Sequence, residues 1–207
     1  MRGPRRQGKG IARVAEAGIV MVMSETLVQR MTAEELIGLA ESGAISCDAR
    51  IELLEGLIVD MLPIGPFHGD ILGWFTDEFG RLNQGRWSMR VQDALHLDKD
   101  SLPQPDLMLL QRQRYRPKHP GPNNVFLLIE VADSSLKFDK TAKVPLYARA
   151  GIREVWVVNV PDTLVEVYRD PTPTGYRTQR TVQIGGTVSP LAFPDVVLKT
   201  SDISSEE

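Results

Sequence analysis

Two acidic residues occupy positions next to or within apolar runs, where a carboxylate is unusual. Asp106 follows Pro105 at the start of the segment 106–110, and Glu130 lies inside the run 125–131. A charge in a buried strand costs several kcal/mol unless a metal ion or a partner offsets it. If the two strands are neighbours, the carboxylates converge, and such a pair of oxygen ligands suits Mg²⁺ or Mn²⁺. In the alternative interpretation, Asp106 caps a turn and Glu130 pairs with an arginine.

A helix predicted over 138–150 places a cation near this pair. Asp139, Lys143 and Tyr147 are spaced i, i+4 and i+8, so they share one helix face. The default interpretation of such spacing is a surface Asp–Lys pair. The apolar residues after Lys143 indicate instead a helix packed against the sheet. A lysine on that face could lean towards the carboxylates and steady developing negative charge or help activate a water.

The surrounding chain predicts the elements that would position these groups. A helix over 32–43 begins at Thr32 with a capping-box pattern, and a β-hairpin over 50–60 turns at Glu55 and Gly56. An amphipathic helix follows over 67–83. Further strands are predicted over 88–97, 106–110, 125–131, 154–160 and 164–169. The order predicts an α/β fold in which helices flank a mixed sheet, with the uniformly apolar run 125–131 in its centre.

The length and composition predict one domain. With 207 residues, 42% of them hydrophobic, the chain can bury a core, and its one cysteine, Cys47, excludes an intrachain disulfide. We expect a disordered or extraneous tail over 1–23, a single domain over 24–200 and a frayed acidic tail over 201–207. No apolar run approaches the ~20 residues that span a bilayer. We therefore expect no membrane partner. The single cysteine agrees best with a cytoplasmic location.

The charge is distributed unevenly. Residues 1–13 carry five basic side chains and no acid, which leaves 19 basic and 27 acidic residues in the remainder. A domain that acidic is not a generic polyanion binder, so contact with nucleic acid needs a local basic patch. The best candidate is a loop just after the segment 106–110. We expect it to follow a phosphodiester backbone through Arg112, Arg114, Arg116 and Lys118. A solvated loop that balances an acidic domain is the alternative.

Several short motifs occur in one order along the chain. They are Arg50-Ile51-Glu52-Leu53-Leu54-Glu55-Gly56, His68, Pro105-Asp106, Glu130-Val131-Ala132-Asp133-Ser134-Ser135, Asp139, Lys143, Tyr147-Ala148-Arg149-Ala150-Gly151-Ile152 and Glu154-Val155-Trp156-Val157-Val158. This order resembles the Uma2 family of bacterial proteins, which belongs to the PD-(D/E)XK restriction-endonuclease-like superfamily. The resemblance covers roughly 31–198, nearly the whole expected domain.

The resemblance implies a restriction-endonuclease-like core with an added N-terminal helix and hairpin. It also implies a metal-dependent phosphodiesterase that acts on nucleic acid, with DNA as the expected substrate and a homodimer as the expected assembly. Asp106 would be the Asp of the PD element and Glu130 the first acid of the (D/E)XK element, and together they would hold Mg²⁺ or Mn²⁺. Ala132 stands where the lysine of that element belongs. Lys143 is expected to replace it.

Other residues receive supporting roles by the same resemblance. Glu52 could complete the acidic cluster, and Gln92 could face the same site and contact substrate. His68 is expected as a general base or a supporting residue, although a simple helix-start histidine is the alternative. Asp139, Tyr147 and Ser134 are expected to support the site. A nucleic-acid-binding or interaction module with little or no turnover is the second functional hypothesis, because a fold does not guarantee an activity.

Overall fold

A six-stranded mixed sheet forms the centre of the fold in this computed structural model, which describes residues 30–46 and 49–203. The strand order is β3–β4–β5–β6–β7–β8, and every neighbouring pair is antiparallel except β5 and β6. The strands are β3 (Ser88–Val91), β4 (Leu107–Leu110), β5 (Val125–Ala132), β6 (Glu154–Asn159), β7 (Leu164–Thr172) and β8 (Gly175–Gln183). The predicted central position of the apolar run 125–131 is confirmed, because β5 has three strands on one side and two on the other.

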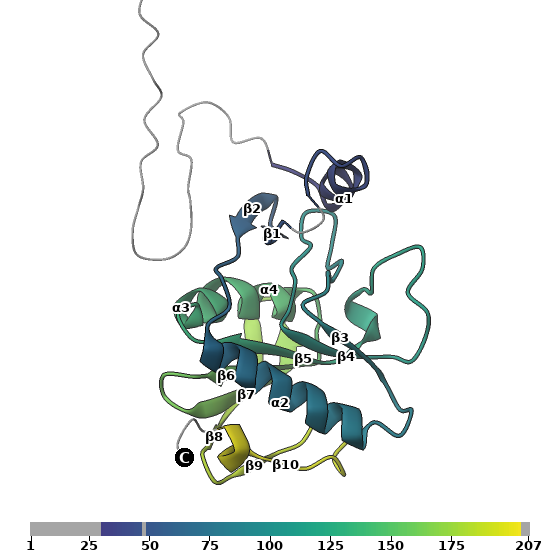
Figure 1. The fold of residues 1–207 in the computed structure, drawn as a ribbon. Coiled ribbons are helices and arrows are strands. Elements are labelled where there is room, and N and C mark those ends of the chain that lie inside the picture. The colour runs from purple at the N-terminus through teal and green to yellow at the C-terminus, as the bar shows by residue number, and fades with distance from the viewer. Residues whose placement is uncertain (1–29, 47–48, 204–207) are drawn as a thin grey trace, which may run out of the picture.

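Helices cover both faces of this sheet (Figure 1). The helix α2 (Pro66–Leu82) covers one face. On the other face lie α3 (Leu136–Phe138), a π-helical turn (Asp139–Lys143) and α4 (Val144–Arg149). Because side chains alternate along a strand, Leu127 and Ile129 of β5 pack with α2, whereas Leu128 packs with α4. The predicted α/β class, with helices flanking a mixed sheet, is confirmed.

The predicted N-terminal helix and hairpin lie outside the main sheet: the hairpin lies next to α4, and the helix lies beyond the hairpin (Figure 1). The helix α1 (Ala33–Glu41) begins with the predicted capping box, in which Thr32 and Glu35 bond each other reciprocally. The strands β1 (Ile51–Leu54) and β2 (Leu57–Asp60) pair only with each other as a sheet, and a bridge between Leu53 and Leu102 attaches the hairpin to the domain. The hairpin is therefore a separate two-stranded sheet that is attached to the domain near Leu102.

The crossover from β5 to β6 is helical over the predicted range, with one irregular turn. In the π-helical turn, the Val144 amide donates to the carbonyl of Asp139, five residues back. Pro145, which has no N–H, lies in the first turn of α4, as expected for a proline that marks where a regular helix begins. Gly151, which follows the C-cap Ala150, has a φ of +79° and ends the helix.

One predicted strand is wrong in length. The segment 88–97 forms a strand only to Val91, because Gln92 adopts a φ of +48° and turns the chain out of the sheet. Leu95 and Leu97 are buried nonetheless, in the cluster beneath α4. The predicted strand over 106–110 begins one residue late, so Asp106 immediately precedes β4.

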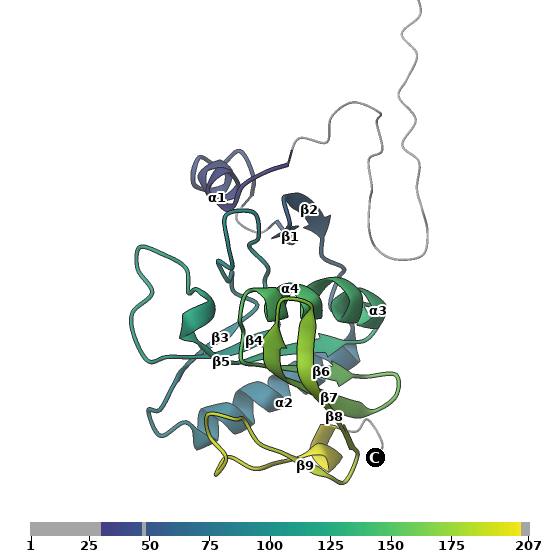
Figure 2. The same cartoon turned by 180° about the vertical axis from the view of Figure 1, so that it is seen from behind.

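The C-terminal part forms a long hairpin and a small second sheet. The hairpin β7–β8 rises beside α4 (Figure 2), and Tyr168 and Tyr176 pack in the cluster beneath that helix. The strands β9 (Thr187–Val188) and β10 (Leu198–Lys199) pair with each other, and a 3-10 helix, η3 (Thr200–Ile203), follows. Ser201 and Asp202 are exposed but Ile203 is buried, so the start of the predicted tail 201–207 belongs to η3 and is anchored to the core by Ile203. The positions 204–207, like the predicted tail 1–23, lie outside the described residues.

Candidate active site

A cavity of about 560 Å³ lies where the hairpin, the start of α2 and the helical crossover meet the sheet. Asp106 and Glu130 both line it, and they come from adjacent strands whose register pairs Leu107 with Ile129. The predicted convergence of these two carboxylates is thus present in the structure. The other charged lining residues are Arg50, Glu52, Asp60, His68, Asp133, Lys137, Asp139 and Lys143.

Glu130 is buried on the face of the sheet that α4 covers. Its Oε1 accepts a hydrogen bond from the Tyr147 hydroxyl at 2.5 Å and lies 3.4 Å from Lys143 Nζ. Its partners are therefore a tyrosine and a lysine, so the alternative prediction of an arginine partner is wrong. Burial raises the pKa of Glu130 well above its ordinary value, and the nearby carboxylates raise it further, whereas Lys143 only partly opposes this shift.

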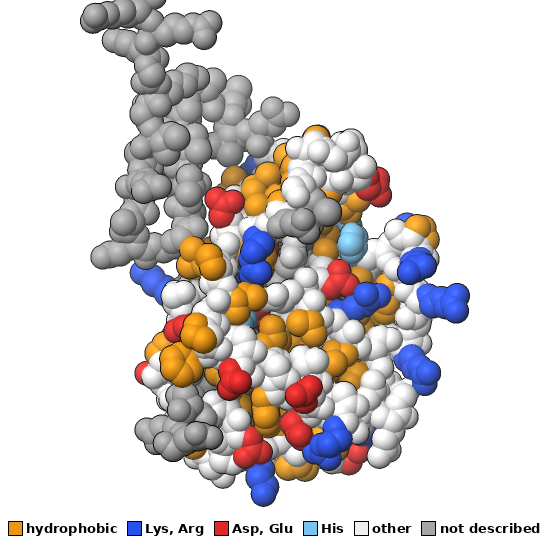
Figure 3. All heavy atoms as spheres, in the orientation of Figure 1, with side chains coloured by type: hydrophobic (Ala, Val, Ile, Leu, Met, Phe, Trp, Pro, Cys, Tyr) orange, Lys and Arg blue, Asp and Glu red, His pale blue; other side chains and the backbone are white. Residues whose placement is uncertain are grey.

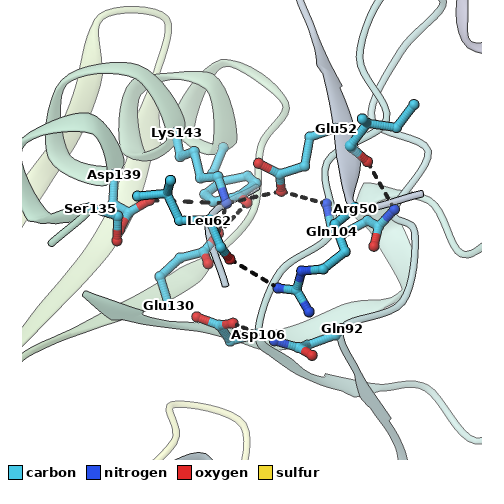
Figure 4. A network of polar contacts seen from close by, with 12 residues as sticks. Arg50, Glu52, Leu62, Gln92, Gln104, Asp106, Glu130, Ser135, Asp139 and Lys143 are labelled. Atoms are coloured by element: carbon cyan, nitrogen blue, oxygen red, sulfur yellow. Dashed lines mark hydrogen bonds and ion pairs between the residues drawn. The ribbon is translucent and has the colours of Figure 1, made fainter. Parts of the chain in front are cut away.

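Lys143 lies among three carboxylates (Figure 4). Its Nζ is 2.9 Å from Glu52 Oε1 and 4.0 Å from Asp139 Oδ1, in addition to its contact with Glu130. The side chain is buried, so the surface Asp–Lys pair offered as the default interpretation is wrong. Burial alone lowers the pKa of Lys143, but the carboxylates raise it more, and the net pKa lies above the ordinary value. Lys143 therefore stays charged at neutral pH.

Two acids hold this lysine from opposite sides. Glu52 reaches it from β1, and its Oε1 also accepts a 2.7 Å hydrogen bond from the backbone amide of Gln104. Asp139 reaches it from the π-helical turn and accepts a 2.5 Å hydrogen bond from Ser135 Oγ. Burial raises the pKa of Asp139 to about 6. The hairpin and the crossover helix are thus joined through one buried ammonium group.

Asp106 lies at the other side of the cavity and is held by three donors. Its Oδ1 is 3.0 Å from His68 Nε2 and 3.2 Å from Gln92 Nε2, and its Oδ2 accepts a 2.8 Å bond from the Val131 amide. Burial raises the pKa of Asp106, but the contact with His68 and the Val131 amide outweigh burial and lower it. His68 belongs to the first turn of α2, as predicted, and it also contacts the site.

Gln92 faces the site as predicted, but its side-chain amide donates to Asp106. The left-handed backbone of Gln92, which ends β3, turns the side chain towards this carboxylate. The side-chain amide of Gln92 thus has a protein partner, and its expected contact with substrate stays a prediction. It holds the Asp106 carboxylate in place.

The residues present fit a divalent cation held by two carboxylates and water. Four buried acids line the cavity, Glu52, Asp106, Glu130 and Asp139, whereas Lys143 is the one buried lysine among the described residues, so negative charge is in excess. Glu130 Oε2 accepts no hydrogen bond from the described residues and is open to the cavity. Within 30–46 and 49–203 no three His, Cys, Asp or Glu side chains form a closed metal-binding group. Mg²⁺ needs no such group, since it commonly keeps several waters and takes one or two carboxylates.

The predicted basic loop does not line the cavity. Arg112, Arg114, Arg116 and Lys118 are exposed and follow the far end of β4, whereas Asp106 precedes its near end. Lysine and arginine side chains gather over this loop at the right edge of the molecule in Figure 3. Arg112 donates to the carbonyl of Gly85. Ser134, by contrast, lines the cavity as expected.

Four charged cavity residues had no role in the sequence-based prediction: Arg50, Asp60, Asp133 and Lys137. One signal for Arg50 was available. It stands two residues before Glu52, and alternate residues of a strand face the same side. Asp133 and Lys137 lie in the turn after β5 and in α3, where no strand alternation predicts side-chain direction.

A family model matches residues 39–201, and its description is "Putative restriction endonuclease". The chain belongs to the Uma2 family. This confirms the resemblance drawn from the ordered motifs between Arg50 and Val158. The matched range contains every cavity residue named above, so the Uma2 domain and the candidate site coincide.

A solved structure supports the same fold. The chain is similar to the crystal structure of a "putative nuclease belonging to DUF820 from Anabaena variabilis ATCC 29413", with a TM-score of 0.65 and 16% sequence identity. The similarity covers 84% of this chain and 97% of the other chain. No curated protein matches the chain. None of the helices in the described ranges is long and apolar enough to cross a membrane.

Proposed function

We propose that this Uma2 protein is a metal-dependent endonuclease that hydrolyses phosphodiester bonds, with DNA as its substrate. The observation that carries the proposal is the meeting of Asp106 and Glu130, from neighbouring strands, in an open cavity beside the buried cation Lys143. An excess of carboxylates around a solvent-reaching cavity is typical of a site for Mg²⁺ or Mn²⁺.

Each residue has a role in this proposal. Asp106 and Glu130 hold the metal ion, which when bound supplies a water of lowered pKa and polarises the phosphate. Lys143 remains protonated among its carboxylates and stabilises negative charge that develops on the phosphate oxygens. Glu52 and Asp139 hold the ammonium group in place, and Tyr147 fixes Glu130.

His68, Gln92 and Ser134 complete the site. His68 and Gln92 both contact Asp106 Oδ1, so they orient the carboxylate. His68 also lines the cavity, where its imidazole serves as the general base. Ser134 lies at the cavity wall with its hydroxyl available to a phosphate oxygen. The basic loop after β4 then contacts the backbone of a substrate long enough to extend beyond the cavity.

A second function is favoured by one specific observation. Lys143 pairs with the carboxylates themselves, and both oxygens of Asp106 accept bonds from the protein. Most of the cluster is thus satisfied by protein partners, as in a nuclease fold retained only for binding nucleic acid or another partner. In that case the protein binds its ligand but does not cleave it.

Nicking of a supercoiled plasmid by the purified protein, with Mg²⁺, Mn²⁺ or EDTA, tests the proposal. We expect metal-dependent nicking that Glu130→Gln and Asp106→Asn abolish while circular dichroism shows a retained fold. Asp77→Asn, which neutralises an exposed acid on α2, serves as the matched control. Full nicking by a folded Glu130→Gln protein would overturn the proposed metal site. Binding without nicking by the wild type would favour the second function.

The homodimer and the cytoplasmic location belong to the same proposal. Each protomer carries one cavity of this kind among its described residues, so cutting both strands of a duplex is simplest with two protomers. Sedimentation equilibrium with and without DNA measures this stoichiometry.

A further inference from the structure

Two basic side chains line the cavity without a carboxylate partner in the described part of the chain. Lys143 and His68 both contact acids of the cluster. Arg50, on the hairpin, and Lys137, in α3, line the same cavity, are exposed, and form no ion pair with any residue of the described ranges. Their positive charges are therefore available to a ligand.

Arg50 has donors left over after its contacts with the protein. Its only side-chain hydrogen bond to the described part of the chain runs from Nη2 to the carbonyl of Leu62 at 3.5 Å, at the outer limit for such a bond. A guanidinium has five N–H donors, so most remain unused. Arg149 and Arg169, by comparison, each donate to a carboxylate at 2.7 Å.

The backbone fixes the direction of the Arg50 side chain. The Met61 amide donates to the Arg50 carbonyl at 2.8 Å and so holds the start of the hairpin. Glu52, two residues on, points to Lys143, and strand alternation places Arg50 on the same side. Figure 4 shows the Arg50 guanidinium directed towards Asp106 and Glu130.

We propose that Arg50 forms a phosphate-binding site at the mouth of the cavity, assisted by Lys137, whose ligand is a phosphodiester group of the nucleic acid. This inference rests on the proposed function and names the residue that holds the substrate there. Both cations line the cavity that holds Asp106 and Glu130, so a phosphate bound beside these carboxylates lies within the positive field of Arg50 and Lys137. The planar fork of a guanidinium binds two phosphate oxygens at once, which a lysine cannot do.

In a different role, Arg50 would neutralise part of the negative charge of the acids that line the cavity. The two roles predict different effects of removing the side chain. Asp60 and Asp133 also line the cavity, so a balancing arginine would support folding and reduce repulsion within the site. Its loss would then change thermal stability and Mn²⁺ affinity. A phosphate-binding arginine instead affects nucleic-acid affinity and its dependence on salt.

The experiment compares Arg50→Ala and Arg50→Lys with Arg177→Ala, which removes an exposed arginine from β8, a strand that does not line the cavity. Fluorescence anisotropy measures binding to a labelled DNA duplex in EDTA over a series of salt concentrations. Calorimetry measures Mn²⁺ affinity. We expect Arg50→Ala to weaken DNA binding about ten-fold and to reduce the salt slope by about one. Arg50→Lys should keep the slope but lose part of the affinity.

Mn²⁺ affinity and melting temperature should remain those of the wild type in both Arg50 variants, and Arg177→Ala should match the wild type throughout. Wild-type DNA affinity in Arg50→Ala overturns the inference, as does an equal loss in Arg177→Ala or a loss accompanied by altered Mn²⁺ affinity. If the wild type cleaves DNA with metal while Arg50→Ala is unaffected, only this inference fails. If the wild type neither binds nor cleaves DNA, the proposed function fails as well.

Discussion

The Tyr147 hydroxyl donates a 2.5 Å hydrogen bond to Glu130 Oε1, and both groups are buried. Burial, followed by the nearby carboxylates, raises the pKa of Tyr147 well above its ordinary value, so the tyrosine remains a donor at neutral pH. Since Lys143 contacts the same oxygen, the pair leaves Oε2 as the oxygen that faces the cavity. Tyr147 is thus a positioning residue for the proposed metal ligand.

Removing this hydroxyl should weaken both the fold and the site. Tyr147→Phe leaves the ring in place but removes a charge-assisted hydrogen bond, so we expect a loss of about 1–3 kcal/mol in the free energy of unfolding, measured with urea. Nicking should fall while the affinity for DNA is unchanged. Tyr176→Phe, which removes a hydroxyl bonded to the Ile152 carbonyl, is the control for stability alone. Unchanged nicking in Tyr147→Phe would contradict the positioning role.

Lys143 should be essential to the stability of its acidic neighbours. Lys143→Met keeps most of the apolar part of the side chain but leaves buried carboxylates without their cation, which we expect to cost about 3–5 kcal/mol. Adding Glu52→Gln should recover part of this loss, because it removes one of the stranded charges. Chemical denaturation of both single variants and the double variant measures this coupling. Strictly additive effects would show that the two groups do not interact in solution.

Asp139 should make the protein less stable as the pH rises from about 4 to about 7. Its pKa of about 6 in the folded state exceeds the ordinary value of 3.8, so between these pH values the folded state binds more protons than the unfolded state. The free energy of unfolding therefore falls as the pH rises through this range. The cost is at most about 3 kcal/mol. We expect the stability of Asp139→Asn relative to the wild type to increase over this range, as measured by urea denaturation at successive pH values. Asp77→Asn should show no such trend, and a flat difference for Asp139→Asn would refute the assignment.

The basic loop should contribute affinity without affecting the chemical step. Replacing Arg114, Arg116 and Lys118 together by alanine should weaken DNA binding similarly for all sequences and lower its salt dependence. The cleavage rate at saturating DNA should stay at the wild-type value, because the loop lies at the far end of β4 from Asp106. A reduced cleavage rate at saturating DNA would show that the loop takes part in the chemical step. Unchanged DNA affinity would show that the loop is solvated and does not contact DNA.

The helices and strands that depend on patterns among neighbouring residues were predicted correctly from the sequence. The capping box at Thr32, the amphipathic face of α2 and the apolar run of β5 all depend on neighbouring residues, and all are confirmed. The i, i+4, i+8 spacing likewise predicted that Lys143 and Tyr147 would reach the same place. These predictions hold because helical and strand periodicity determine which face a side chain occupies.

Long-range placement was less accessible from the sequence. The loop 112–118 is close to Asp106 along the chain, yet the four residues of β4 carry it about 13 Å away. The left-handed backbone of Gln92 has no sequence signal, because glutamine seldom adopts it. The proximity of Glu52 to Lys143 depends on how the hairpin docks on α4, which strand patterns within the hairpin do not determine.

The π-helical turn at 139–143 has an evolutionary consequence. Such a turn amounts to one extra residue inserted into an α-helix. The widened turn accommodates this residue locally, so the helical segments before and after it keep the faces they would have in a regular helix. Deleting one residue between Asp139 and Lys143 would leave these two side chains three positions apart in a regular helix, where they still share a face. In this crossover, relatives should therefore tolerate the loss of one residue at this turn, provided that both side chains are kept.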